Sequence, residues 1–370
     1  LVASPPQATS LPGCLLQPGR MLFAARVYKT FDGLVSYLVV LNYSFNMRAW
    51  QVSQLGNPID VLELKEVNEI SDPIEGHIQV SIQSVGISFP DVLQCRGEYQ
   101  VKPALPWTPG GESAGIVTKI GDGVTDIEPG DRVMMLGGGL IERVNVRSTG
   151  VWKIPDNFAF EKAAAVPVNY GTTWFALHQR GNIQSGETVL VTGAAGGTGS
   201  AAIQLAKATG AMVIAITGGA EKTKQAEFLG ADHVIDHQIN GDWVDEVREL
   251  SNGGVDIAYD PVGGDTTHQV RRCMAWDGRL LIIGFVAGIP DLPTNHMLLK
   301  NYSVVGVHWG ASLGRDPQSL NNQMHSIIEL AEKGFVDPLI FKPYEFENGA
   351  VAIQDLADRK TWGKVIVRVG

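Results

Sequence analysis

Apolar runs alternate with helical patterns over residues 188–310. The runs are apolar at nearly every position, which is typical of strands covered by helices on both faces of a sheet. They lie at residues 188–192, 212–217, 233–236, 255–260, 279–284 and 302–307. Helical patterns separate them near residues 197–209, 221–229, 242–250 and 265–275. This alternation predicts an α/β fold with a doubly wound parallel sheet.

From Met47 to about residue 170 the pattern is different, with short β-like runs set between glycines and prolines. Such runs lie at residues 78–85, 114–120 and 132–135. They indicate a mostly β domain with few helices. After Gly310 an amphipathic helix near residues 318–332 precedes two more β-like runs, at 339–346 and 364–369. We expect this tail to fold back onto the β domain.

Composition supports two domains and narrows the classes of partner. The chain has 370 residues, 44% of them hydrophobic, which is enough apolar material for two cores. Its formal net charge of −10 argues against binding to nucleic acid or to an anionic membrane. The longest near-continuous apolar run, residues 34–41, is far too short to span a bilayer. We therefore expect no nucleic-acid partner and no membrane insertion.

The cysteines and the first 46 residues indicate in which cellular compartment we expect the protein. Three cysteines without a C-x-x-C pair argue against a disulfide framework and a cysteine-rich metal site, so we expect a reducing compartment such as the cytoplasm. Residues 1–46 contain one acid and two Pro-Gly pairs, and we interpret them as a leader. The leader is either a disordered, incidental segment or a transit segment, and a transit segment would direct the protein to the mitochondrial matrix.

A glycine-rich turn joins the first strand of the parallel sheet to its first helix. The strand TVLVT is followed by Gly193-Ala194-Ala195-Gly196-Gly197-Thr198-Gly199, and a helical pattern begins at once. Glycines allow a tight turn and let backbone N–H groups approach a pyrophosphate at the positive end of the helix. The turn predicts a dinucleotide site formed by Ala194, Gly196, Gly197, Thr198 and Gly199. Ala194 stands at the usual first glycine position, directly after Gly193.

The end of the second strand indicates which nicotinamide cofactor binds. NAD-binding folds place an acid there to bind the ribose 2′-OH. This chain has Thr217-Gly218-Gly219 instead, followed by Glu221 and Lys222. The missing carboxylate removes repulsion of a 2′-phosphate, and Lys222 supplies a positive charge. We therefore predict NADPH.

Several segments spread over residues 47–370 resemble a known family. They include Cys95-Arg96-Gly97-Glu98-Tyr99-Gln100, Thr108-Pro109-Gly110-Gly111-Glu112, Gly130-Asp131-Arg132-Val133, Ala164-Ala165-Val166-Pro167, the glycine turn, Tyr259-Asp260-Pro261-Val262-Gly263-Gly264 and Leu298-Leu299-Lys300-Asn301. In this order they resemble the quinone oxidoreductase branch of the medium-chain dehydrogenases and reductases. The resemblance implies a GroES-like catalytic domain, residues 47–170 and 311–370, around a Rossmann domain, residues 171–310. It also implies a homodimer.

The resemblance further implies which residues form the site. Zinc-dependent relatives have a cysteine and a histidine where this chain has Ser88 and Gly111, so we expect no metal. The implied cofactor contacts are Thr172, Gly218, Lys222, His237, Gly284, Phe285, Val286 and Arg359, with His237 in place of a tyrosine found in relatives. Tyr99 and Ser88 are the implied catalytic residues of the substrate pocket, where Ser88 replaces the usual asparagine. Asp91, close by, has either a turn-capping or a catalytic role, and Cys95 is expected to be a small buried hydrophobe.

These expectations combine into one function with two alternatives. We expect a zinc-independent enzyme that transfers a hydride from NADPH to a quinone or another activated conjugated carbonyl compound. The first alternative is a reductase of enoyl thioesters or alkenals. The second is a non-catalytic protein that binds NADPH, as in the crystallin members of the same branch.

Overall fold

The computed structural model describes residues 28–30, 33–35 and 46–370. Strands β1 (Tyr28–Thr30) and β2 (Gly33–Val35) pair with each other in antiparallel orientation. Most of the predicted leader, residues 1–46, and of the apolar run 34–41 lies outside the described residues. No described helix is both long enough and apolar enough to cross a bilayer.

The predicted parallel sheet is present, with six strands in the order β12-β11-β10-β13-β14-β15. Its strands are β10 (Thr188–Val191), β11 (Met212–Thr217), β12 (His233–Asp236), β13 (Val255–Asp260), β14 (Met274–Ile282) and β15 (Ser303–Gly306). The strand order reverses between β10 and β13. The carboxyl ends of these two central strands are therefore the topological switch point of a Rossmann sheet. The predicted fold class is confirmed.

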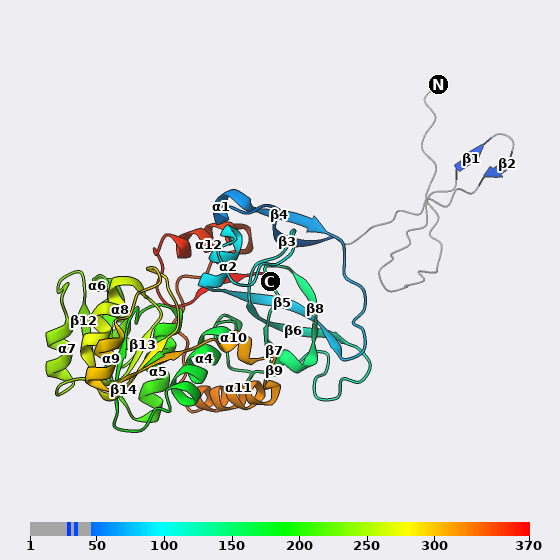
Figure 1. Cartoon of the computed structure of the whole chain (residues 1–370). Helices are drawn as coiled ribbons and strands as arrows, with labels where there is room; N and C mark the ends of the chain where they lie inside the picture. The colour runs from blue at the N-terminus through cyan, green and yellow to red at the C-terminus, as the bar shows by residue number, and fades with distance from the viewer. Residues whose placement is uncertain (1–27, 31–32, 36–45) are drawn as a thin grey trace.

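Five helices follow the parallel strands (Figure 1): α5 (Gly197–Thr209), α6 (Ala220–Phe228), α7 (Val244–Leu250), α8 (Gly264–Val270) and α9 (Thr294–Lys300). The helix predicted over 265–275 is wrong at its end, because β14 already begins at Met274. Asp277, within β14, has φ of +60°, and the pairing of β14 with β13 shifts register there. The irregular backbone around Asp277 breaks the period-2 alternation of a strand, which explains why the start of β14 resembles a helix in sequence.

The second sheet is antiparallel and forms the GroES-like part. Its order is β16-β5-β6-β7-β9, with β8 also paired to β5. These strands are β5 (His77–Ile87), β6 (Glu112–Ile120), β7 (Arg132–Leu136), β8 (Arg143–Arg147), β9 (Val151–Lys153) and β16 (Val365–Arg368). A separate hairpin pairs β3 (Met47–Val52) with β4 (Leu62–Val67). The remaining helices are α1 (Pro58–Val61), α2 (Phe89–Arg96), α3 (Phe160–Ala163), α4 (Pro167–Trp174), α10 (Trp309–Ser312), α11 (Pro317–Glu332) and α12 (Gly349–Ala357).

The tail returns to the antiparallel sheet, as expected. Strand β16 pairs with the end of β5, from Ser84 to Ile87. The β-like run predicted over 339–346 is not a full strand, since it joins the β16 segment only at Ile340 and Tyr344. Pro343 lies between these two bridges and has no N–H to donate to a ladder, which explains the interruption.

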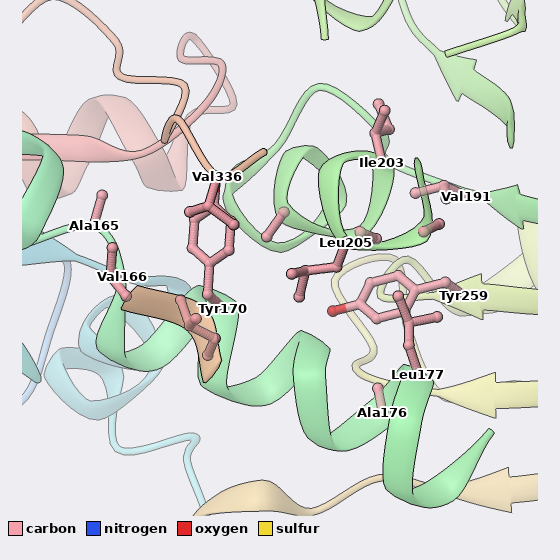
Figure 2. Close-up of a cluster of buried hydrophobic side chains, with 14 of the residues drawn as sticks. Ala165, Val166, Tyr170, Ala176, Leu177, Val191, Ile203, Leu205, Tyr259 and Val336 are labelled. Atoms are coloured by element: carbon pink, nitrogen blue, oxygen red, sulfur yellow. The ribbon is translucent and has the colours of Figure 1, made fainter. Parts of the chain in front are cut away.

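One hydrophobic core cluster contains buried side chains of α4, α5 and strands of the parallel sheet (Figure 2). Tyr170 of α4, Leu205 of α5 and Tyr259 of β13 are fully buried in it. Burying an aromatic or leucine side chain contributes about 1.5–3 kcal/mol. The Tyr170 hydroxyl donates to Gln204 Oε1 at 2.5 Å, which satisfies the polar end of this ring. Helix α4 is thereby held against the helix that follows the glycine-rich turn.

Candidate active site

The glycine-rich turn lies at the switch point, between β10 and α5. Gly193 has φ of +55°, a left-handed conformation that favours glycine. A Cβ on Gly199 would come within 2.3 Å of the Gly193 carbonyl oxygen, so the first turn of α5 fits the loop only without a side chain. The 13-residue helix α5 points its positive end at this loop. Backbone N–H groups and the positive end of the helix are the groups that could hold a pyrophosphate here.

Asp260, at the end of β13, holds the two strand ends of the switch point together. Its carboxylate is 1% exposed and accepts hydrogen bonds from Thr192 Oγ1 at 2.7 Å and Thr267 Oγ1 at 2.5 Å. It also accepts one from the Val262 N–H at 3.0 Å. These bonds fix the turn after β10 relative to the turn after β13, so the two turns at the switch point are held in place before any ligand binds.

The two basic residues predicted to bind the 2′-phosphate, Lys222 and Arg359, lie side by side. Lys222 Nζ donates to the Arg359 carbonyl oxygen at 3.3 Å, and the Arg359 guanidinium donates to the Val286 carbonyl oxygen at 3.1 Å. Burial, followed by the nearby Arg359 charge, lowers the pKa of Lys222. The Lys222 ammonium contacts the Arg359 backbone rather than its guanidinium, but the two positive charges are close enough to repel each other, and a bound anion would relieve that repulsion.

Gly218 and His237 also lie side by side. A Cβ on Gly218 would come within 2.6 Å of His237 Nε2, so glycine is needed for the imidazole to lie there. His237 itself is exposed. The Asp236 carboxylate, next in sequence, accepts from the Gly219 and Gln238 N–H groups at 2.9 Å each, and these bonds lower its pKa. These bonds connect the turn after β11 to the end of β12 through backbone N–H groups.

The other predicted cofactor contacts lie beside the switch point. Gly284, Phe285 and Val286 follow β14, and the Val286 N–H donates to the Pro261 carbonyl at 3.5 Å, a long bond. Phe285 is 44% exposed, so its ring is free to cover a ligand. Thr172 lies in α4, where neighbouring Asn169 would contact a Cβ added to Gly197. Both segments therefore border the glycine-rich turn.

Ser88 is the N-cap residue of α2, and Asp91 fixes the position of its backbone. The buried Asp91 carboxylate accepts from the Ser88 N–H through Oδ2 and from the Gly110 N–H through Oδ1, both at 2.8 Å. Burial raises the pKa of Asp91. The structure thus assigns Asp91 the capping role of the two that the sequence left open. Cys95 is buried, and burial raises its thiol pKa to about 12, in agreement with the predicted small hydrophobe.

Tyr99 follows α2 by three residues and is half-buried. Burial, and then the Asp91 charge, raises the pKa of its phenol. The phenol therefore keeps its proton at neutral pH and is able to donate a hydrogen bond.

Two functional candidates were missed in the sequence: Glu112, which begins β6, and Lys364, which precedes β16. Their side chains are 0% and 2% exposed and form an ion pair. Lys364 Nζ also donates to Ser88 Oγ at 2.5 Å. We refer to Ser88, Glu112 and Lys364 as the Lys364 cluster. The sequence did hold a signal for this pair. Glu112 and Lys364 each stand just before an apolar run, and a charged side chain that is buried there needs a partner of opposite charge.

The Lys364 cluster does not fit a catalytic zinc. Ser88 Oγ already receives the Lys364 ammonium, and a second cation at that oxygen would be repelled. Gly111 has no side chain to offer. Among residues 46–370, no group of three or more His, Cys, Asp or Glu side chains is placed to hold a metal ion.

Comparisons with known proteins agree with this geometry. Residues 74–156 match the alcohol dehydrogenase GroES-like domain model, and residues 197–330 match the zinc-binding dehydrogenase model. The quinone oxidoreductase-like protein 2 homolog of Nematostella vectensis is 37% identical over 327 residues, covering 86% of this chain and 88% of that protein. Quinone oxidoreductase-like protein 2 of Mus musculus is 38% identical over 295 residues, covering 78% and 84%. A structure of Escherichia coli quinone oxidoreductase complexed with NADPH superposes with a TM-score of 0.79 at 29% identity, covering 87% of this chain and 100% of that one.

The parallel sheet with its glycine-rich turn, the GroES-like antiparallel sheet and the two matching family models define an oxidoreductase of the medium-chain dehydrogenase/reductase superfamily. Within that superfamily the chain belongs to the quinone oxidoreductase-like family, as its sequence segments suggested.

Proposed function

We propose that this protein transfers a hydride from NADPH to a quinone or a similar activated conjugated carbonyl compound, without zinc. The observation that carries the proposal is the hydrogen bond from Lys222 Nζ to the Arg359 carbonyl oxygen, which brings the two cationic residues together beside the end of β11. A pair of cations there suits a 2′-phosphate, and no carboxylate ends β11 to favour NAD. The solved relative with NADPH supports the same cofactor.

The residues divide into those that hold the cofactor and those that face the substrate. Ala194, Gly196, Gly197, Thr198 and Gly199 would hold the pyrophosphate, while Gly218, Lys222, His237 and Arg359 would hold the 2′-phosphate end. Thr172, Gly284, Phe285 and Val286 would border the nicotinamide. When bound, NADPH supplies the hydride. Tyr99 and Ser88 then orient the acceptor and donate hydrogen bonds to its oxygen.

A panel of acceptors tests this function. Purified protein is mixed with NADPH or NADH and with quinones, alkenals or enoyl thioesters, and loss of the reduced-cofactor absorbance is followed. We expect the fastest loss with NADPH and quinones. Faster reduction of alkenals or enoyl thioesters would favour the first alternative function. Tight binding of NADPH without turnover of any acceptor would favour the non-catalytic alternative.

We also propose a division into domains and a homodimer. Residues 47–170 and 311–370 form the GroES-like domain in this proposal, and residues 171–310 form the Rossmann domain. Strand β15 is the last strand of its sheet, and the neighbouring Leu298 and Leu299 of α9 are 80% and 73% exposed. A second copy pairing at this edge would cover both features. Cytoplasmic or mitochondrial location stays a prediction.

A further inference from the structure

The Lys364 cluster places a buried cation directly behind Ser88, a predicted substrate-facing residue. Lys364 Nζ lies 2.5 Å from Ser88 Oγ and forms an ion pair with Glu112 Oε1. Glu112 Oε2 accepts from the Val168 N–H at 2.8 Å, so both carboxylate oxygens are occupied. A side-chain ion pair this deeply buried is costly to form, which calls for an explanation beyond packing.

Hydrogen-bond chemistry determines which way the Ser88 hydroxyl points. An ammonium group only donates, so Ser88 Oγ must accept the bond from Lys364. The Ser88 hydrogen is then left to donate elsewhere. Its partner within the cluster is Glu112 Oε1, at 3.3 Å, which is a long bond to an oxygen that Lys364 already uses. An acceptor oxygen of a substrate beside Ser88 would offer that hydrogen a shorter bond.

The backbone around Lys364 connects this cluster to the nucleotide crevice. The adjacent Gly363 N–H donates to the Ala195 carbonyl oxygen, inside the glycine-rich turn, at 2.6 Å. Glu112 contacts Val168 at the start of α4, the helix that carries Thr172. The cluster therefore lies where the nucleotide loop, α2 and α4 converge. If the proposed function holds, the hydride acceptor must lie beside these three segments. The inference rests on that function.

We propose that Lys364 is a positioning residue that turns the Ser88 hydroxyl toward the substrate and strengthens it as a donor. An acceptor that has gained a hydride carries negative charge on its oxygen. Ser88 donates a hydrogen bond to that oxygen, and the ammonium behind it adds favourable electrostatics. Ser88 and Lys364 keep their protons, and the oxygen takes its proton from water. Glu112 holds the ammonium in place.

Kinetics of variants test this role. Ser88→Ala, the pair Lys364→Met with Glu112→Gln, and the triple variant are compared with wild type for NADPH-dependent quinone reduction. The paired change removes both buried charges together, so neither is left alone. We expect kcat to fall about 10- to 100-fold in each, with KM and the NADPH Kd changed less than about threefold. A control pair, Lys162→Met with Asp337→Asn, removes an exposed ion pair and should leave kcat unchanged.

The triple variant separates positioning from a structural effect. If Lys364 acts through Ser88, the triple variant should be no slower than Ser88→Ala alone, because the same donor is lost once. Losses that multiply would overturn the inference, as would an unchanged kcat in Ser88→Ala. A wild-type protein that reduces no acceptor would overturn the proposed function and this inference with it. An active wild type with unaffected variants would overturn the inference alone.

A readout without turnover uses 4-nitrophenol, whose phenolate is coloured and mimics the oxygen anion. Bound to wild-type protein with NADP⁺, its pKa should fall by about one unit, because the ammonium-backed donor favours the anion. Ser88→Ala should abolish the fall. This titration also tests whether Ser88 stabilises the anion if the variant with Lys364→Met and Glu112→Gln does not fold. A nitrophenol pKa that is equal in wild type and Ser88→Ala would overturn the inference.

Discussion

Lys222 is the side chain on which cofactor choice should depend most. Its amine lies 3.3 Å from the Arg359 carbonyl oxygen, at the end of the crevice assigned to the 2′-phosphate. We predict that Lys222→Ala weakens NADPH about 10- to 100-fold, since a hydrogen bond to a charged group contributes about 1.5–3 kcal/mol. NADH, which lacks the phosphate, should bind almost as before. Fluorescence titration with both cofactors measures the difference.

Lys224 provides a matched control on the same helix. It is exposed on α6, two residues further along, and its replacement by alanine should leave both affinities unchanged. An equal loss for NADPH and NADH in Lys222→Ala would mean that Lys222 does not contact the 2′-phosphate.

The Tyr99→Phe variant tests whether the Tyr99 phenol donates a proton in the reaction or only helps to position the acceptor. Burial raises the phenol pKa, so the hydroxyl is protonated at neutral pH, yet Phe keeps the ring face against a flat acceptor. We predict that kcat with a simple quinone changes by less than about tenfold, because water can protonate the product oxygen. General acid catalysis would cost about 10²–10⁴. A loss above about a hundredfold, with normal NADPH binding, would make Tyr99 a general acid.

Single residues were predictable where a local motif specifies them. Lys222 and Gly199 follow from the strand, turn and helix around them, and the structure places Gly199 in the first turn of α5 and Lys222 beside Arg359. Lys364 and Glu112 were not found, because their contact joins residues 252 positions apart along the chain. Asp91 illustrates the intermediate case, in which the sequence placed the residue near the site but only its bonds to Ser88 and Gly110 identified its role.

At the scale of elements, the start of α5 depends on Gly199. A Cβ there would lie 2.3 Å from the Gly193 oxygen and 2.8 Å from the Ala194 Cα, so the loop itself would have to move. We predict that Gly199→Ala weakens NADPH at least about tenfold and lowers the free energy of unfolding by roughly 1–3 kcal/mol. Denaturant unfolding and cofactor titration measure the two effects.

Gly241→Ala is the matched control for this change. No atom lies within 4 Å of a Cβ added to Gly241, so the variant should behave as wild type in both measurements. If Gly199→Ala also behaved as wild type, the close approach between α5 and the loop would be unimportant for the nucleotide site.

Elements were predicted best where both faces of a strand are buried. Strands β11 and β13 begin and end at the predicted residues, because they are nearly all apolar and buried. The edge strand β12 also has its predicted bounds, although only Ile235 of its four residues is buried. Helix α9 was not predicted, because its seven residues hold their apolar side chains in one run, Met297 to Leu299, which has no helical spacing. The run 339–346 was wrong as a strand because Pro343 interrupts its pairing, although it still lies beside the β16 segment.

For the whole molecule, we predict activity without metal. The Lys364 ammonium occupies the position on Ser88 Oγ that a metal ion would need. Chelator treatment should leave the rate of NADPH oxidation unchanged, and the purified protein should hold less than one zinc per chain by elemental analysis. Activity that a chelator removes and zinc restores would contradict the proposed mechanism.

The stability of the whole molecule should fall with acid partly through His178. Burial lowers its pKa from the usual 6.5 to about 4. Below about pH 6.5 the unfolded chain therefore binds a proton that the folded chain resists, and stability declines until the pH nears about 4. The slope from this group is at most about 1.4 kcal/mol per pH unit. Unfolding by denaturant at several pH values measures it.

Replacing His178 by glutamine should flatten the pH dependence of stability between about pH 6.5 and about 4. The control is His325→Gln, since His325 is exposed on α11 and should not alter the profile. Profiles of equal slope for wild type and His178→Gln would show that His178 is protonated freely in the folded protein.

The order of segments around the antiparallel sheet has a consequence for how the protein is made. Strand β16, at Val365–Arg368, pairs with β5, at His77–Ile87, and the whole parallel sheet is translated between them. While the ribosome is still adding residues, the nucleotide-binding half can already fold. The end of β5 then presents an open edge, and Glu112 lacks the cation that pairs with it. A nascent chain would therefore be exposed to misassociation at β5 until β16 emerges and supplies both the missing strand and Lys364.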